Sequence, residues 1–211
     1  FTTATDSHNT AVGFLAGKLI TTGVTNTFIG SRSGEASTDA DLNTAVGFAS
    51  LLLNTVGSNS VAIGNSALES QNPATATTMY NTAVGSAAGA AVTTGVNNTF
   101  IGGLAGDAIN TSNSNTAVGY NALSAETSSN GNVAIGEGAL GEHTAVGLIA
   151  GGSITTGTNN TFVGGLAGNT STTASNVVIV GYNNETSAVD TAQVIVLGSG
   201  VTSQAANNFT F

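Results

Sequence analysis

Asn9-Thr10-Ala11-Val12-Gly13 is the first copy of a five-residue motif that returns along the whole chain. Most steps between successive closing glycines are 17 residues long, with one step of 21 and one of 11. A short fixed period is typical of repeat proteins, in which each unit buries its apolar face only by stacking on its neighbours. The closing glycines are Gly13, Gly30, Gly47, Gly64, Gly85, Gly102, Gly119, Gly136, Gly147, Gly164, Gly181 and Gly198.

The residues of the motif predict a short β-strand that ends at each glycine. The position before the glycine is aliphatic and mostly β-branched, and the position two places earlier is mostly threonine, both of which favour strands. Alternate residues of a strand share a face, so we expect these two positions to face the core and the alanine or phenylalanine between them to face outward. The aliphatic ladder includes Val12, Ile29, Val46, Ile63, Val84, Ile101, Val118, Ile135, Val146 and Val163.

Two further columns of the repeat complete the fold prediction. Asparagine recurs four places before the glycine and predicts a ladder of amides bonded along the stack. Small residues recur three places after it, as at Ala16 and Ser33, and indicate a thin coil. The sequence therefore predicts an all-β fold, a parallel β-solenoid (β-roll or β-helix) of about twelve coils with a 17-residue period. The asparagine ladder comprises Asn9, Asn26, Asn43, Asn81, Asn98, Asn115, Asn132 and Asn160.

A longer repeat of four coils overlies the short one. The residue four places after the glycine is glycine in two coils and leucine in the next two, and phenylalanine replaces alanine once per block. We interpret 1–211 as one solenoid with internal blocks 9–80, 81–142 and 143–203, and segments 1–8 and 204–211 as capping or subunit-joining strands. Phenylalanines at the expected outer face and at the two ends are the predicted assembly residues: Phe1, Phe28, Phe100, Phe162, Phe209 and Phe211.

Composition narrows the classes of partner. The chain has 2 basic and 11 acidic residues, a net charge of -9, which argues against nucleic acid and anionic membranes because both attract basic patches. No apolar run approaches the length of a membrane span, so we expect no membrane insertion. Cysteine is absent, which excludes disulfides and thiol chemistry. Only Lys18 and Arg32 could serve trypsin-like proteases, which suits a protein outside the cell. We therefore expect an extracellular or cell-surface protein, or alternatively a virion protein.

Few residues suggest chemistry. Glu35, Asp39 and Asp41 form an acidic group that is a weak candidate for calcium, although solvated loop charge is the favoured interpretation. Glu137 and Glu142 could in principle be a glycosidase pair, but nothing beside them suggests a sugar cleft. We therefore expect no enzyme activity, no catalytic residue, no metal and no cofactor.

One stretch resembles a known family. Asn59-Ser60-Val61-Ala62-Ile63-Gly64, followed by Ser66 and Ala67, resembles the head repeats of trimeric autotransporter adhesins, which are left-handed parallel β-rolls. The stretch 115–123 is similar to the repetitive shafts of phage and virus tail fibres. The resemblance covers roughly 9–198 and implies a β-solenoid that associates as a trimer.

Three functions remain open from the sequence. The first is a structural subunit of an extracellular or cell-surface filament or adhesive fibre, a homo-oligomer or homopolymer that assembles end to end by strand stacking and also laterally. The second is a trimeric shaft or receptor-binding segment of a phage tail fibre. The third is an ice-binding or glycan-binding face, with a cell-surface glycan as partner, suggested by a threonine column at Thr21, Thr38, Thr55, Thr93, Thr127, Thr155 and Thr172.

Overall fold

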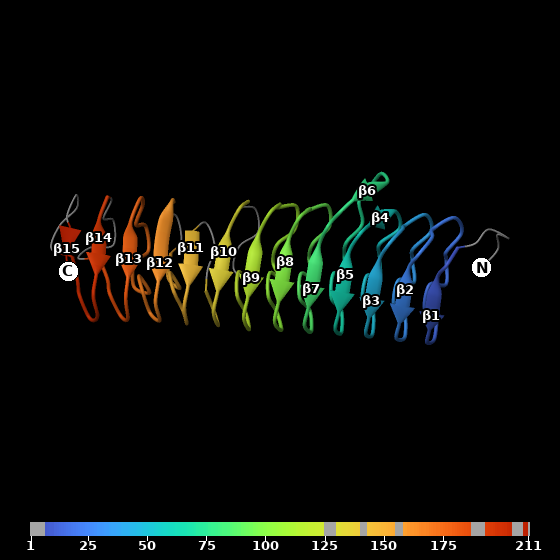
Figure 1. The fold of residues 1–211 in the computed structure, drawn as a ribbon, viewed down its shortest axis with the longest axis horizontal. Coiled ribbons are helices and arrows are strands. Elements are labelled where there is room, and N and C mark those ends of the chain that lie inside the picture. Colours follow the sequence, from blue (N-terminus) through green and yellow to red (C-terminus); the bar gives the residue numbers. More distant parts are fainter. Residues whose placement is uncertain are drawn as a thin grey trace.

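The computed structural model describes residues 7–124, 130–139, 143–154, 158–186, 193–203 and 209–210, and every regular element in these ranges is a β-strand. Thirteen short strands form one parallel sheet that runs the length of a rod (Figure 1). They are β1 (Thr10–Val12), β2 (Thr27–Ile29), β3 (Thr44–Val46), β5 (Val61–Ile63), β7 (Thr82–Val84), β8 (Thr99–Ile101), β9 (Thr116–Val118), β10 (Val133–Ile135), β11 (His143–Val146), β12 (Asn160–Val163), β13 (Val178–Val180), β14 (Ile195–Leu197) and β15 (Phe209–Thr210).

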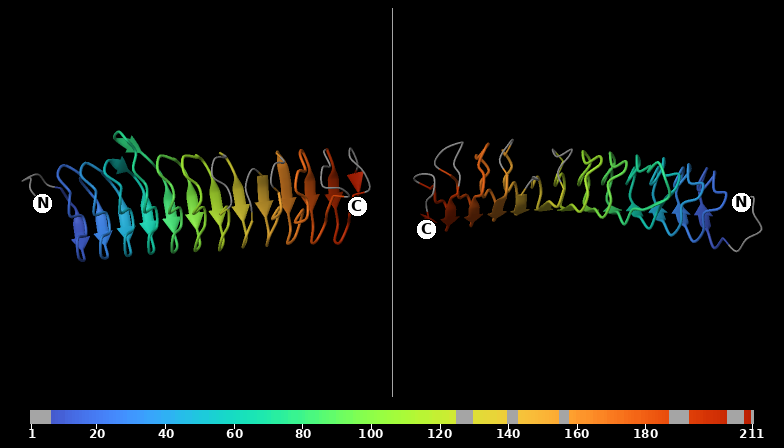
Figure 2. Two further views of the ribbon diagram at one scale, coloured as in Figure 1. Left: turned by 180° about the vertical axis from the view of Figure 1, so that it is seen from behind. Right: turned by 90° about the horizontal axis from the view of Figure 1, so that it is seen from above.

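Consecutive strands of this sheet pair in the register of the sequence repeat. Thr10 pairs with Thr27 and Val12 with Ile29, an offset of 17 residues that most strand pairs share. The offset is 21 between β5 and β7, 11 between β10 and β11, and 14 between β14 and β15. The strands lie along one side of the rod and the return segments project to the other (Figure 2). The predicted parallel β-solenoid with a period of about 17 residues is therefore confirmed.

The longest coil adds a second, smaller sheet. β4 (Gly57–Ser58) pairs in parallel with β6 (Thr77–Thr78), and β6 projects beyond the row of coils (Figure 1). The extra residues between Gly64 and Gly85 thus extend the return segment and leave the main strands β5 and β7 paired directly.

The prediction of which strand face is buried was wrong. The middle residues of the strands, such as Ala62 and Ala117, are fully buried. The aliphatic residues before the glycines are partly or largely exposed, and the exposed ones range from 37% at Val163 to 58% at Val12. A three-residue strand directs one side chain to one face and two to the other. The thin coil has room for the single small side chain, so the two β-branched positions lie outside, where their shape still suits a pleated surface.

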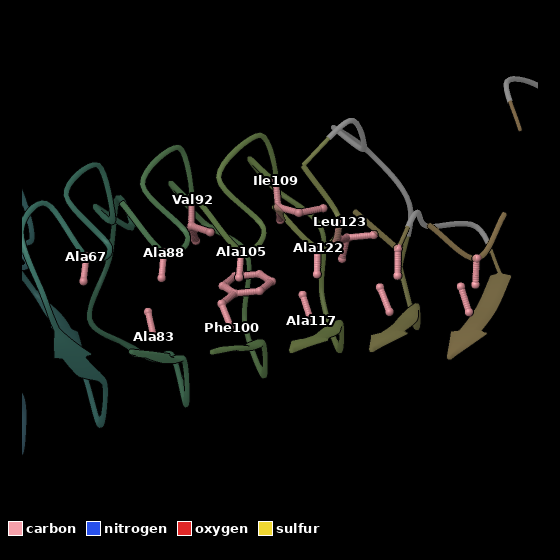
Figure 3. Close-up of a cluster of buried hydrophobic side chains, with 14 of the residues drawn as sticks. Ala67, Ala83, Ala88, Val92, Phe100, Ala105, Ile109, Ala117, Ala122 and Leu123 are labelled. Atoms are coloured by element: carbon pink, nitrogen blue, oxygen red, sulfur yellow. The ribbon is translucent and has the colours of Figure 1, made fainter. Parts of the chain in front are cut away.

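Phe28, Phe100 and Phe162 are correspondingly core residues with no exposed surface, so their prediction as assembly residues was also wrong. The glycines four places after the closing glycine make room for their rings. A Cβ at Gly34 would lie 2.5 Å from Phe28 Cε1, and one at Gly106 would lie closer than 3.0 Å to the Phe100 ring. Figure 3 shows Phe100 pointing from its strand into the same layer as the neighbouring alanines.

Leucine occupies the same position in the other two coils of the first two four-coil blocks, whose strands carry alanine. Leu51, Leu68 and Leu123 are fully buried and fill the volume that a phenylalanine ring takes elsewhere. Each of the three has a left-handed backbone, with φ between 48° and 57°, like the glycines that they replace. The alternation of glycine and leucine in the sequence therefore reflects a fixed core volume that is filled from one side or the other.

The closing glycine is required by space as well as by conformation. Gly13 has φ +132°, a region that side chains avoid, and a Cβ there would lie 2.6 Å from the carbonyl carbon of Gly30 in the next coil. The glycines of successive coils are thus in direct backbone contact at the end of every strand, which explains why the motif always ends in this residue.

Candidate functional site

The asparagine column forms a buried ladder that joins each coil to the next. Asn98 Oδ1 accepts the backbone N–H of Asn115 at 2.9 Å, and Asn98 Nδ2 donates to the carbonyl of Ser112 at 2.9 Å. One amide therefore satisfies two backbone groups that the turn leaves unpaired. The same two-sided arrangement occurs at Asn9, Asn26, Asn43, Asn81 and Asn160, while Asn115 accepts the N–H of Asn132 and donates to Asn98 Oδ1.

Gln71 lies at one break in this ladder. Ser60 stands where asparagine is expected, and the buried Gln71 Oε1 accepts from Asn81 Nδ2 at 2.9 Å. Gln71 Nε2 donates to Ser60 Oγ at 3.1 Å and to Asn54 Oδ1 at 3.3 Å. The side chain supplied by the long coil thus joins Ser60, Asn54 and Asn81 where the ladder lacks an amide. Sequence analysis missed this residue because its column carries different side chains in different coils.

The acidic candidates do not come together. Asp41 Oδ1 accepts the N–H of Val24 at 2.8 Å, and Glu35 Oε2 lies 2.6 Å from the Arg32 guanidinium. Asp39 Oδ1 accepts the Thr22 hydroxyl at 2.5 Å. Within the described ranges no three His, Cys, Asp or Glu side chains are grouped as metal ligands. Glu137 is exposed, and Glu142 lies outside the described residues.

The threonine column of the third hypothesis bonds along the stack. The hydroxyls of Thr21 and Thr38 each donate to the backbone carbonyl of the threonine in the next coil at 3.1 Å, and the Thr55 hydroxyl donates to Asn72 Oδ1 at 2.7 Å. These hydroxyls are therefore already used in holding coils together. Thr127 and Thr155 lie outside the described residues.

The exposed face of the main sheet is uncharged along its described length. It is made of the threonine or valine at the first outward position and the valine, isoleucine or leucine before each glycine. We call these two columns the outer row. The outer row contains Ile29, Ile63, Ile101, Ile135, Val163 and Val180, each about 40% exposed.

A second exposed apolar row borders the sheet. It consists of the aromatic residues among those that directly follow a closing glycine, and we call it the aromatic row: Phe14, Phe48, Tyr120 and Tyr182. Their exposure runs from 51% at Phe48 to 72% at Phe14. Leu148 holds the same position between the two tyrosines. Isolated exposed apolar residues are ordinary on proteins, but two aligned rows are not.

Two carboxyl groups are partly buried in return segments. Burial raises the pKa of Glu185, against the opposing effect of hydrogen bonds from Thr170 and Ser171. Burial also raises the pKa of Asp107, whose Oδ1 has no hydrogen-bond partner. The two lie in different coils, so they do not form a catalytic pair with each other.

Of the predicted joining residues at the ends, only Phe209 can be placed. It lies in β15, pairs with Ile195 and is 54% exposed. Phe1 and Phe211 lie outside the described residues.

Comparison with protein-family models, with curated proteins and with solved structures finds no match for the chain. No helix of the described residues has the length and apolarity needed to cross a lipid bilayer.

Proposed function

We propose that this chain is a structural subunit of an extracellular or cell-surface fibre, and that copies associate side by side through the outer row. The observation that supports the proposal is the row itself, an uncharged strip of Thr, Val and Ile on a sheet of thirteen strands. Each molecule carries a net charge of -9, so copies repel unless they meet through a surface free of charge. The outer row is such a surface.

The area of the outer row suits association of whole rods. Thirteen strands at ~4.8 Å spacing give a length of about 60 Å, and three residues at ~3.3 Å give a width of about 10 Å. Each copy would bury about 600 Å², or about 1,200 Å² for a pair, which is the lower end of the range for stable interfaces. Pairing therefore needs most of the row at once.

Ile101→Lys tests the proposal by placing a charge in the middle of the outer row. We expect the unchanged protein to form oligomers or fibres in light scattering and electron microscopy, and Ile101→Lys to give single rods, because a buried unpaired ammonium opposes the interface. Thr94→Lys is the matched control, since Thr94 is exposed on a return segment and receives the same charge.

Two outcomes would contradict the proposal. A monomer at every protein concentration would exclude self-association, and equal loss of assembly in Thr94→Lys would remove the role of the outer row. Uniform short rods of fixed stoichiometry would instead favour the shaft of a tail fibre over an open-ended filament.

A further inference from the structure

We propose that the aromatic row binds an extended, uncharged, β-1,4-linked polysaccharide, with sugar rings stacking on the side chains of Phe14, Phe48, Tyr120 and Tyr182. This inference goes beyond the fibre role and uses a different set of residues from the outer row. It depends on the spacing of the rings, on how they are supported and on the charge around them.

The spacing of the row follows a period of two coils. Phe14 and Phe48 are two coils apart, and Phe48 and Tyr120 are four coils apart with Ser86 midway. Tyr120 and Tyr182 are also four coils apart, with Leu148 midway, so the aromatic residues are separated by two or four coils. At ~4.8 Å per coil, two coils span about 10 Å. This distance matches the disaccharide unit of an extended β-1,4-linked chain, in which every second sugar presents the same face. A flat polysaccharide can therefore meet successive side chains with equivalent sugar rings.

The tyrosine rings are supported by glycine in the preceding coil. A Cβ added to Gly103 would lie 3.6 Å from Tyr120 Cδ2, and one added to Gly165 would lie 3.5 Å from Tyr182 Cδ2. Each ring therefore lies against a neighbouring coil that carries no side chain at the equivalent position, and about 60% of each tyrosine stays exposed. A ring held in place loses less conformational entropy when a ligand binds.

The surroundings of the aromatic row favour an uncharged ligand. The intervening positions are mainly small or polar, including Ser31, Asn65 and Ser86, which can hydrogen-bond to sugar hydroxyls. Glu137 is the one charged residue of this column in the described structure. The net charge of -9 repels anionic polysaccharides, and no basic residue of the row would attract them.

The test measures sedimentation of the protein with three insoluble polysaccharides: cellulose, chitin and, as an α-linked control, starch. We expect binding to cellulose, chitin or both and not to starch, and the two β-linked arms identify the source. The double variant Tyr120→Ser/Tyr182→Ser should weaken binding at least tenfold. Tyr80→Ser is the matched control, because Tyr80 is equally exposed but lies in another column.

Three results would overturn the proposal: no binding to either β-linked polymer, equal binding to starch, or an equal loss of binding in Tyr80→Ser. Circular dichroism and the thermal midpoint check that each variant keeps the fold. Repeating the assay with Ile101→Lys separates the two proposals, since single rods should still bind polysaccharide if the aromatic row is the site.

Discussion

Asn98 illustrates how one side chain holds two coils together. Its amide is fully buried, accepts the N–H of Asn115 and donates to the carbonyl of Ser112. Serine stands at position 60 in place of the amide, and Gln71 there bonds to the side chains of Ser60 and Asn81. An amide suits the position because it offers a donor and an acceptor at once, which neither alanine nor a carboxylate does.

Asn98→Ala should therefore be strongly destabilising. The substitution leaves a buried N–H and a buried carbonyl without partners, at a cost of roughly 2 to 5 kcal/mol. Urea unfolding followed by circular dichroism should show a clearly lower midpoint. Asn65→Ala is the control, since Asn65 is exposed, and should change stability by less than about 0.5 kcal/mol. Equal midpoints for the two variants would show that the ladder contributes little.

At the scale of the coil, the important feature is the fit between strand and return segment. Phe100 occupies space that Gly89 and Gly106 leave open, while Leu123 occupies it where the strand carries Ala117. The coils thus share one backbone path but differ in which of their residues fill the core. Overfilling such a core forces side chains off their preferred rotamers or displaces the backbone, typically at a cost of about 1 to 3 kcal/mol.

Two deletions of equal length test this fit. Deleting 103–119 puts Leu123 in the place of Gly106, against the Phe100 ring, and should destabilise the rod. Deleting 120–136 removes one coil but leaves Phe100 beside Gly106, so the loss should be smaller. Thermal unfolding compares the two proteins. Equal midpoints would show that core volume does not restrict the order of coils. In that case, adding Phe100→Ala to the first deletion should not raise its thermal midpoint.

At the scale of the whole molecule, the core is a continuous layer along the rod and not a central cluster. Each coil contacts only its neighbours, and its core is a single layer of small side chains with occasional larger ones. Stability is then close to a sum over coils and their interfaces, and damage at one end does not propagate far. The surfaces proposed to carry function are the outer row and the aromatic row, whose positions recur with the coil.

Because each coil depends mainly on its neighbours, cleavage near one end should leave the rest of the rod folded, which limited proteolysis can test. Trypsin can cleave only after Lys18 and Arg32, whose side chains are about half exposed and lie in the first two coils. We expect digestion of the folded protein to leave a fragment beginning at Ser33 that keeps the β-sheet signal, as measured by mass spectrometry and circular dichroism. Loss of that signal after cleavage would instead show that the rod unfolds as one unit.

Much of the architecture could be predicted from columns of the repeat. The closing glycines set the period, the asparagines marked the position that bridges coils, and the alternation of Gly and Leu marked the four-coil block. The direction of the strand residues could not be predicted, because strand preference and the aliphatic column before the glycine favoured the two flanking positions over the alanine between them. Gln71 could not be predicted either, since a residue whose hydrogen bonds are needed in a single coil does not recur with the period.

The sequence by itself determined that parallel strands stack at a 17-residue period, because only stacking can satisfy so many identical short units. The tertiary structure alone decided which face of each strand is inside. The physical reason is volume: the coil is too thin to enclose two β-branched side chains per strand, so only the middle residue of each strand enters the core. That residue is alanine, phenylalanine or, in β13 and β14, isoleucine and valine. The two flanking positions are left on the outside, and they form the surface on which the proposed assembly depends.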